Sequence, residues 1–265
     1  MAPSDGFTCR SRPPKTLTFD AHPRSSLIVA LDFDSLNSAV KFAKQVADLV
    51  GMFKIGSQLF TAAGPTAVRE VTALGPGVFL DLKFHDIPNT VAGAVLSAAA
   101  MTGVQLVNVH ALGGSAMLHA AVQAISAGQP MGADRPRLLA VTILTSLDQK
   151  TMREVGIGGP PTSRVVKLAK LAKSAGVDGV VASVQETQAI RRECGRDFLI
   201  VTPGVRPKHE DSASTAKTDD QARTATPAEA IKAGADFIVV GRPILAAPDP
   251  RAAAQAIVEE IAAAK

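Results

Sequence analysis

The chain has 265 residues, of which 46% are hydrophobic, and its 28 Lys and Arg against 24 Asp and Glu give a formal net charge of +4. This composition is too apolar for a disordered chain. Two cysteines are too few for a disulfide framework, so we expect a cytoplasmic protein. The chain has no Trp or Tyr for base stacking, no long run of Lys and Arg, and no uninterrupted apolar span. We therefore expect neither a nucleic-acid nor a membrane partner.

The first 26 residues differ from the rest of the chain. They are rich in Pro, Ser and Arg and lack periodically spaced apolar residues. No apolar core of the length found in secretory signals follows their charged residues. We predict a flexible N-terminal extension over residues 1–26 and one folded domain over residues 27–265.

From residue 27 onward, short apolar runs rich in β-branched residues alternate with longer amphipathic stretches. Helical patterns include 35–50, 115–126, 163–175 and 228–233, and several begin at a residue suited to capping a helix. Gly176 and Gly234 are typical of helix C-terminal stops. The apolar runs predict buried strands, and they lie at 27–31, 52–55, 78–82, 106–110, 138–142, 179–182, 199–202 and 237–240.

Apolar strands that alternate with helices indicate an α/β fold with a parallel sheet covered on its faces. Eight such units in about 240 residues favour a single closed (β/α)8 TIM barrel. An open doubly wound sheet is the alternative. In a barrel, functional side chains lie at the carboxyl ends of the strands or in the loops that follow them.

The segment DLKFHDIPNT, residues 81–90, carries the densest charge pattern at the end of a predicted strand. A period of two places Asp81 and Lys83 on one face, which points inward in a barrel. Buried charges must pair. Lys54 interrupts another apolar run, and with Asp86 the four charges sum to zero. This pattern favours a charge array with Lys83 as proton donor; a structural ion pair and, for Lys54, a snorkelling side chain are the alternatives.

A phosphate site is expected after the last strand. The loops after the seventh and eighth strands commonly bind phosphate in TIM barrels. Arg242 suits bidentate phosphate binding, and Gly241 beside it allows the backbone to approach an anion. A surface salt bridge is the alternative for Arg242. We expect His110 to be a packed or phosphate-side polar residue and assign no role to His85.

Several motifs occur in order along the chain: LDF at 31–33, KIG at 54–56, DLKFHDIPNT at 81–90, LTS at 144–146, TPGVR at 202–206 and VGRP at 240–243. Over about residues 27–262, the chain resembles the orotidine 5′-phosphate decarboxylase family. The resemblance implies decarboxylation of orotidine 5′-monophosphate (OMP) to UMP and CO2, the last step of pyrimidine synthesis, without a metal or cofactor. It also implies a homodimer.

The resemblance further implies a role for each matching residue. Asp32 and Lys54 match ribose-hydroxyl ligands. Asp81, Lys83 and Asp86 match the catalytic set, in which Lys83 is the proton donor. Asp86 and Thr90 reach the neighbouring subunit's site, and Thr145 lies near the pyrimidine. The phosphate is bound by Arg206, Gln221, Gly241 and Arg242, with Gln221 on a closing loop over 208–226. This loop is longer here, around 209–219, than in the common bacterial form, and a flexible insertion without a phosphate contact is the alternative.

Two other functions remain open from the sequence. The first is a magnesium-dependent sugar-phosphate enzyme of the same superfamily, such as a keto-gulonate-phosphate decarboxylase or a hexulose-phosphate synthase. These enzymes share the Asp-x-Lys-x-x-Asp pattern, but the Ile87–Thr90 continuation and Gln221 argue against them. The second is a non-catalytic nucleotide-binding barrel, against which the complete charge array argues.

Overall fold

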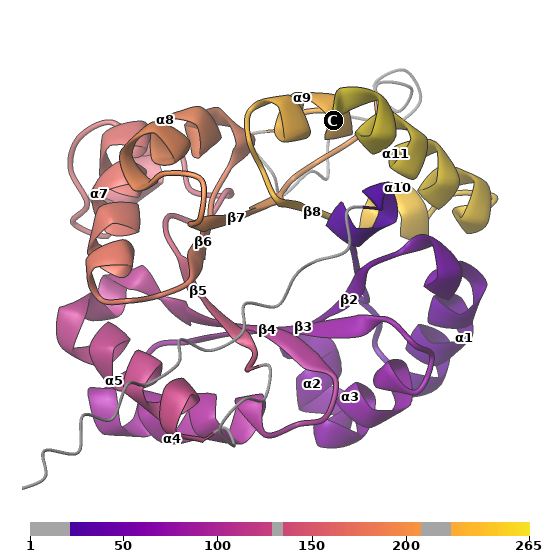
Figure 1. Ribbon diagram of the computed structural model, residues 1–265, viewed down its shortest axis with the longest axis horizontal. Helices are drawn as coiled ribbons and strands as arrows, with labels where there is room; N and C mark the ends of the chain where they lie inside the picture. The colour runs from indigo at the N-terminus through magenta and orange to yellow at the C-terminus, as the bar shows by residue number, and fades with distance from the viewer. Residues whose placement is uncertain (1–21, 129–134, 208–223) are drawn as a thin grey trace, which may run out of the picture.

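The computed structural model describes residues 22–128, 135–207 and 224–265. Within them, parallel strands form a closed barrel in sequence order, each paired with the next and β8 with β1 (Figure 1). The predicted TIM barrel is therefore confirmed, and the doubly wound sheet is excluded. The strands are β1 Leu27–Ala30, β2 Met52–Gly56, β3 Gly77–Phe84, β4 Val104–His110, β5 Arg137–Val141, β6 Gly179–Val181, β7 Leu199–Pro203 and β8 Phe237–Val240.

Strand side chains alternate between the barrel interior and the helical layer. Met52 on β2 lies in the interior cluster with Phe79 of β3, whereas Phe53 and Ile55 pack in the outer cluster against the helices. This alternation places Lys54 inward, one layer above Met52, as the sequence predicts. The apolar interior thus forms a floor beneath polar groups at the carboxyl ends of the strands.

Helices surround the barrel (Figure 1). Ser35 caps the first of them by accepting a hydrogen bond from the Ser38 amide, and Gly176 and Gly234 end two others with φ of +85° and +100°, as predicted. The helices are α1 Leu36–Val46, α2 Ser57–Ala63, α3 Pro65–Thr72, α4 Pro88–Ala99, α5 Gly114–Ala127, α6 Gln149–Glu154, α7 Pro161–Ser174, α8 Val184–Cys194, α9 Pro227–Lys232, α10 Arg242–Leu245 and α11 Pro250–Ala264. Three 3₁₀ turns in the described residues are η1 Pro23–Ser26, η2 Ala47–Leu49 and η3 Ala111–Gly113.

The described part of the predicted extension, residues 22–26, is ordered. Pro23–Ser26 form a 3₁₀ turn, Arg24 donates a hydrogen bond to the Asp48 carbonyl at 2.9 Å, and Ser26 is buried. These contacts join residues 22–26 to the barrel. Residues 1–21 lie outside the described residues, so the flexible extension stays a prediction for them. Across the described ranges, none of the helices has the length and apolar character needed to span a membrane.

One irregularity interrupts the barrel at the end of β3. Leu80 pairs with Val107 of β4, but the next pair joins Phe84 to Val109, so three residues of β3 oppose Asn108 alone. Within this bulge Lys83 has a φ of +52°, the one positive value outside glycine among the described residues. A bulge of this kind redirects side chains at the rim of a barrel, and here it coincides with the most charged segment of the sequence.

Candidate active site

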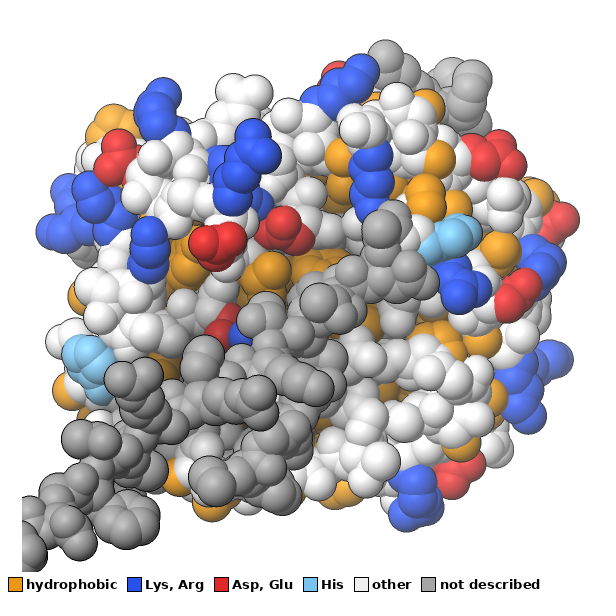
Figure 2. Space-filling model, viewed as in Figure 1, with side chains coloured by type: hydrophobic (Ala, Val, Ile, Leu, Met, Phe, Trp, Pro, Cys, Tyr) orange, Lys and Arg blue, Asp and Glu red, His pale blue; other side chains and the backbone are white. Residues whose placement is uncertain are grey.

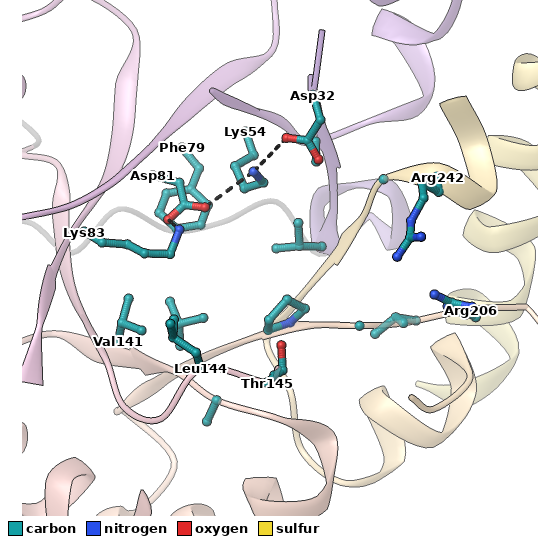
Figure 3. A pocket seen from close by; sticks show the side chains of 18 of the residues that line it. Asp32, Lys54, Phe79, Asp81, Lys83, Val141, Leu144, Thr145, Arg206 and Arg242 are labelled. Atoms are coloured by element: carbon teal, nitrogen blue, oxygen red, sulfur yellow. Dashed lines mark hydrogen bonds and ion pairs between the residues drawn. The ribbon is translucent and has the colours of Figure 1, made fainter. Parts of the chain in front are cut away.

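A pocket of about 320 Å³ opens at the carboxyl ends of the strands. The barrel architecture predicts the site at this end. Figure 3 shows charged side chains from several strands converging on the pocket. Eight of the predicted site residues line it: Asp32, Lys54, Asp81, Lys83, Thr145, Arg206, Gly241 and Arg242.

The carboxylate of Asp81 lies at the centre of a chain of ion pairs. Its Oδ1 is 2.7 Å from Lys83 Nζ, and its Oδ2 is 3.4 Å from Lys54 Nζ. Lys54 Nζ lies in turn 3.2 Å from Asp32 Oδ1. Burial acts to raise the pKa of Asp81, but the ammonium groups of Lys54 and Lys83 outweigh burial and hold that pKa below its ordinary value. Asp81 is therefore ionised at neutral pH.

Lys83 combines a strained backbone with a partly exposed ammonium group. Its positive φ is a conformation that a non-glycine residue adopts at a cost of about 1–3 kcal/mol. The side chain is 38% exposed and lies along one wall of the pocket in Figure 3. Strain of this size persists only where the surroundings impose it, and it brings Nζ to the pocket beside Asp81.

Arg206 and Arg242 lie together at the far end of the pocket from Lys83, with Asp32 and Lys54 between (Figure 3). Arg206 follows β7 and Arg242 follows β8, as the phosphate-site expectation requires. Among the described residues, the charged lining groups are two carboxylates, two ammonium groups and two guanidinium groups, a net formal charge of +2. Two guanidinium groups at one end suit a phosphate, and the net charge of the pocket matches a phosphate dianion.

The remaining wall of the pocket is apolar and was not among the predicted site residues. It is formed by Phe79, Val141, Ile143, Leu144, Val181 and Pro203. All of these except Phe79 fall at or just after the ends of the predicted strands, where the barrel rule could have found them. An apolar wall beside polar groups suits a flat heterocycle.

Asn108, which lies behind the pocket lining, was also missed by the prediction. It is fully buried, donates from Nδ2 to Asp81 Oδ1 at 2.6 Å and accepts from the Lys83 amide at 2.8 Å. A signal was present in the sequence, because Asn108 is a polar residue in an apolar strand, two positions after the inward-facing Leu106.

Two predicted residues, Asp86 and Thr90, are described by the structure and do not line the pocket. Asp86 and Thr90 are exposed on the loop after β3 and the first turn of α4, and Asp86 Oδ1 accepts a hydrogen bond from the Ile87 amide at 2.6 Å. Gln221 lies outside the described residues. In a single copy of the chain, therefore, the pocket holds Asp81 and Lys83 without the second aspartate of the segment.

His110 packs at the edge of the site and does not line the pocket. It stacks on His85, with ring centroids 5.2 Å apart. Burial, reinforced by the nearby His85 and Lys83, lowers the pKa of His110 to about 4. The expectation of a packed residue is met, whereas a phosphate-side position is not, since Lys83 and the arginines lie at opposite ends of the pocket. His85, which was given no role, supplies this stacking partner.

The fold and the pocket together define a TIM-barrel enzyme whose active site joins a carboxylate–lysine array to a cationic anion site. The model of the orotidine 5′-phosphate decarboxylase / HUMPS family matches residues 25–257. Orotidine 5′-phosphate decarboxylase from Geotalea daltonii is 55% identical over 240 residues, covering 91% of this chain and 97% of the relative. The enzyme of the same name from Syntrophotalea carbinolica is 56% identical over 242 residues, covering 91% and 96%.

Among solved structures, the chain is similar to orotidine 5′-phosphate decarboxylase from Lactobacillus acidophilus, with 41% identity and a TM-score of 0.77. The similarity covers 89% of this chain and 98% of that one. The chain belongs to the orotidine 5′-phosphate decarboxylase / HUMPS family, as the motifs predict, and it is a carboxy-lyase.

Proposed function

We propose that this enzyme converts OMP to UMP and CO2 with its own side chains, without a metal or cofactor. The observation that carries the proposal is the 2.7 Å pair of Lys83 Nζ and Asp81 at one end of a pocket whose other end holds Arg206 and Arg242. A nucleoside monophosphate fits this order of groups, with its base at the lysine and its phosphate at the arginines. The names of the relatives support the same substrate.

Lys83 carries the chemical step in this proposal. The bond between the pyrimidine carbon and the carboxylate breaks, CO2 leaves, and the electron pair stays on the ring carbon. The Lys83 ammonium stabilises this developing carbanion and then transfers a proton to it, after which solvent reprotonates the amine. Two unit charges about 4 Å apart attract by roughly 4 kcal/mol at an effective dielectric near 20, so the position of Nζ is decisive. Asp81 holds it there.

The remaining residues bind the parts of the substrate that do not react. Asp32 and Lys54, joined at 3.2 Å, bind the ribose hydroxyls. Arg206 and Arg242 bind the phosphate beside Gly241, and Thr145 lies near the pyrimidine. Binding energy gained at the phosphate orients the base against Lys83. The contribution of Gln221 and the cytoplasmic location stay predictions.

We further propose a homodimer in which Asp86 and Thr90 complete the neighbouring active site. Both residues are exposed in the single chain, and large apolar side chains are exposed at Ile87, on α4 and on η3. Ile87 is 65% exposed, and Leu96 and Leu112 are 42% and 44% exposed. Exposed large apolar side chains beside a charged loop are typical of a protein interface.

Mixing two inactive variants tests the shared site. A Lys83→Ala homodimer and an Asp86→Ala homodimer each contain only defective sites. After subunit exchange, a hybrid dimer has one site with both residues intact, so we expect activity to return to a fraction of the wild-type value. No recovery after exchange has been verified by mass spectrometry contradicts the shared site.

The decisive test of the reaction is the loss of OMP absorbance in the presence of EDTA. Turnover under these conditions supports the proposal. The alternative is a magnesium-dependent sugar-phosphate reaction, since the matched family also includes the HUMPS enzymes. In this chain lysine ammonium groups contact both oxygens of Asp81. Turnover of a keto-sugar phosphate only after magnesium is added would overturn the proposal, and UMP binding without turnover would indicate a binding protein.

A further inference from the structure

The side chain of Asn108 bridges the two residues on which the proposed chemistry depends. Asn108 lies on β4, is 0% exposed, and is not among the residues that line the pocket. We infer that Asn108 is a positioning residue that fixes Lys83 and Asp81 in their reactive arrangement. This inference rests on the proposed function, and it concerns a residue that does not touch the substrate.

The β3 bulge explains why a side chain is needed at this place. Between the pairs Leu80–Val107 and Phe84–Val109, the backbone of β3 leaves its normal register with β4. The Lys83 amide is therefore turned away from an ordinary ladder partner, and it donates to Asn108 Oδ1 at 2.8 Å instead. A buried amide without an acceptor would be costly, so the Asn108 carboxamide makes the positive φ of Lys83 tenable.

The other half of the carboxamide acts on Asp81. Nδ2 of Asn108 donates to Asp81 Oδ1 at 2.6 Å, and the same oxygen accepts from Lys83 Nζ at 2.7 Å. One planar group therefore fixes the backbone of Lys83 and the carboxylate that receives its ammonium. The orientation of the amide follows from the two partners, because the Lys83 N–H can only donate and the ionised carboxylate can only accept.

Few side chains can make both bonds at once. Leucine has a similar size but can make neither. Aspartate has the same shape and can accept from the Lys83 amide, but when ionised it cannot donate and places a second negative charge against Asp81. Protonation of that introduced carboxyl restores a donor. The two substitutions therefore separate the volume of residue 108 from its hydrogen bonds.

The experiment measures kcat, KM and UMP binding for Asn108→Leu and Asn108→Asp from pH 5.5 to 8. For Asn108→Leu we expect kcat to fall about 30-fold while KM stays within about threefold, because misplaced reacting groups affect the chemical step more than ground-state binding. For Asn108→Asp we expect a similar loss at pH 8 and at least a fivefold recovery at pH 5.5, relative to wild type at each pH. A purely structural role would not produce this recovery.

Thr187→Val provides the matched control. Thr187 is also fully buried and donates from Oγ1 to the Ser183 carbonyl at 3.1 Å on α8, away from the pocket. Its loss should lower thermal stability and leave kcat and its pH profile unchanged. If both Asn108 variants fold and keep kcat within threefold, or if Asn108→Asp follows the wild-type pH profile, the inference is overturned.

A second readout does not depend on turnover. The pKa of the Asp81 carboxyl can be followed by carboxyl-carbon NMR in wild type and in Asn108→Leu. The hydrogen bond from Asn108 contributes to the low pKa of Asp81, so its removal should raise that pKa. If wild type fails to decarboxylate OMP, the proposed function fails while this titration still decides the role of Asn108. An unchanged pKa of Asp81 contradicts the inference.

Discussion

Both ends of the barrel carry ion pairs, but the two sets of pairs differ in whether protein groups occupy all of their hydrogen-bonding positions. At the end where the strands begin, Asp178 accepts from two nitrogens of Arg135 at 2.7 and 2.8 Å, from Arg137 at 3.3 Å and from the Leu138 amide at 2.8 Å. At the end where the strands finish, Lys83 Nζ has one carboxylate contact, and its side chain faces the pocket. The first carboxylate is saturated by protein, and the second pair faces a space for a ligand.

Arg191 and Asp236 repeat the saturated arrangement. The Arg191 guanidinium donates to the carbonyls of Gly195, Phe198 and Gly234 and to the carboxylate of Asp236, which also accepts from the Ile200 amide. Acidic and basic side chains lie side by side over β6, β7 and α8 on the face seen in Figure 2. Charges whose bonds return to the backbone stabilise the fold, whereas charges aimed into a pocket bind and transform a substrate.

The largest effect is expected when the Lys83–Asp81 pair at the pocket is removed. Lys83→Ala should lower kcat by at least about 10⁴-fold, because it removes both the positive charge and the proton from the reacting carbon. Binding of UMP, measured by calorimetry, should fall by less than about tenfold. Thermal stability should fall only modestly, since Lys54 still pairs with the buried Asp81 and the Lys83 side chain is partly exposed.

Lys170→Ala is the control for this change, because it removes an exposed lysine that pairs with Glu193 on the outer helices. It should leave kcat unchanged. Turnover in Lys83→Ala at a rate near that of the control would contradict the assignment of Lys83 as proton donor.

The next largest effect is expected at the end of the barrel where the strands begin, when Asp178 is removed. Asp178→Ala leaves Arg135, Arg137 and the Leu138 amide without their shared acceptor in a largely buried position. Loss of one partner from such a network costs about 3–5 kcal/mol, which lowers the melting temperature by roughly 6–20 °C for a chain of this size. Because Asp178 is far from the pocket, kcat and KM of the folded fraction at 25 °C should stay at the wild-type values. A large change in kcat with an unaltered melting temperature would contradict the distinction between the two ends.

Arg242→Ala tests the proposed phosphate site at the end of the pocket opposite Lys83. It should lower kcat/KM by about 10²–10³-fold, because the phosphate loses a charge-assisted contact that orients the base. The loss should include a rise in KM, unlike that of Lys83→Ala. Arg192→Ala, an exposed arginine of α8, is the matched control and should be silent in the same OMP assay. An unchanged KM in Arg242→Ala would remove the arginine from the phosphate site.

Much of the fold could be predicted because each element has a local signal. The eight apolar runs correspond to the eight strands with end shifts of at most two residues, and the glycine stops fall where they were expected. The alternation of side chains along a strand is enough to place Lys54 and Asp81 in the interior of the barrel. These predictions succeed because strand alternation and helix capping depend on near neighbours in the sequence.

The arrangement at the end of β3 could not be predicted in the same way. Period-two alternation assumes a regular strand, but the β3 bulge and the positive φ of Lys83 depend on Asn108, which is 25 residues away in the sequence. The stacking of His85 on His110 is likewise a contact between positions far apart in the sequence, which a local pattern does not predict. The exposed positions of Asp86 and Thr90 could not be predicted for a different reason. The local sequence pattern of one chain does not show which of its residues contact another subunit.

The smallest expected effect is on the pH dependence of stability. The pKa of His110 is about 4 in the folded protein and about 6.5 in the unfolded chain. Above pH 6.5 both states are neutral, and between pH 6.5 and 4 only the unfolded state gains the proton, so folding stability falls as the pH falls. Since His110 is partly exposed, we expect a loss of about 1 kcal/mol.

His110→Phe keeps a ring beside His85 and should remove this part of the slope in urea unfolding between pH 7 and 4.5. The lowered pKa of Asp81 also stabilises the folded protein, and this stabilisation is lost only as the pH falls through that low pKa. Its contribution is the same in wild type and in His110→Phe. Equal slopes for wild type and variant would show that His110 titrates normally and that its position beside Lys83 does not exclude a proton.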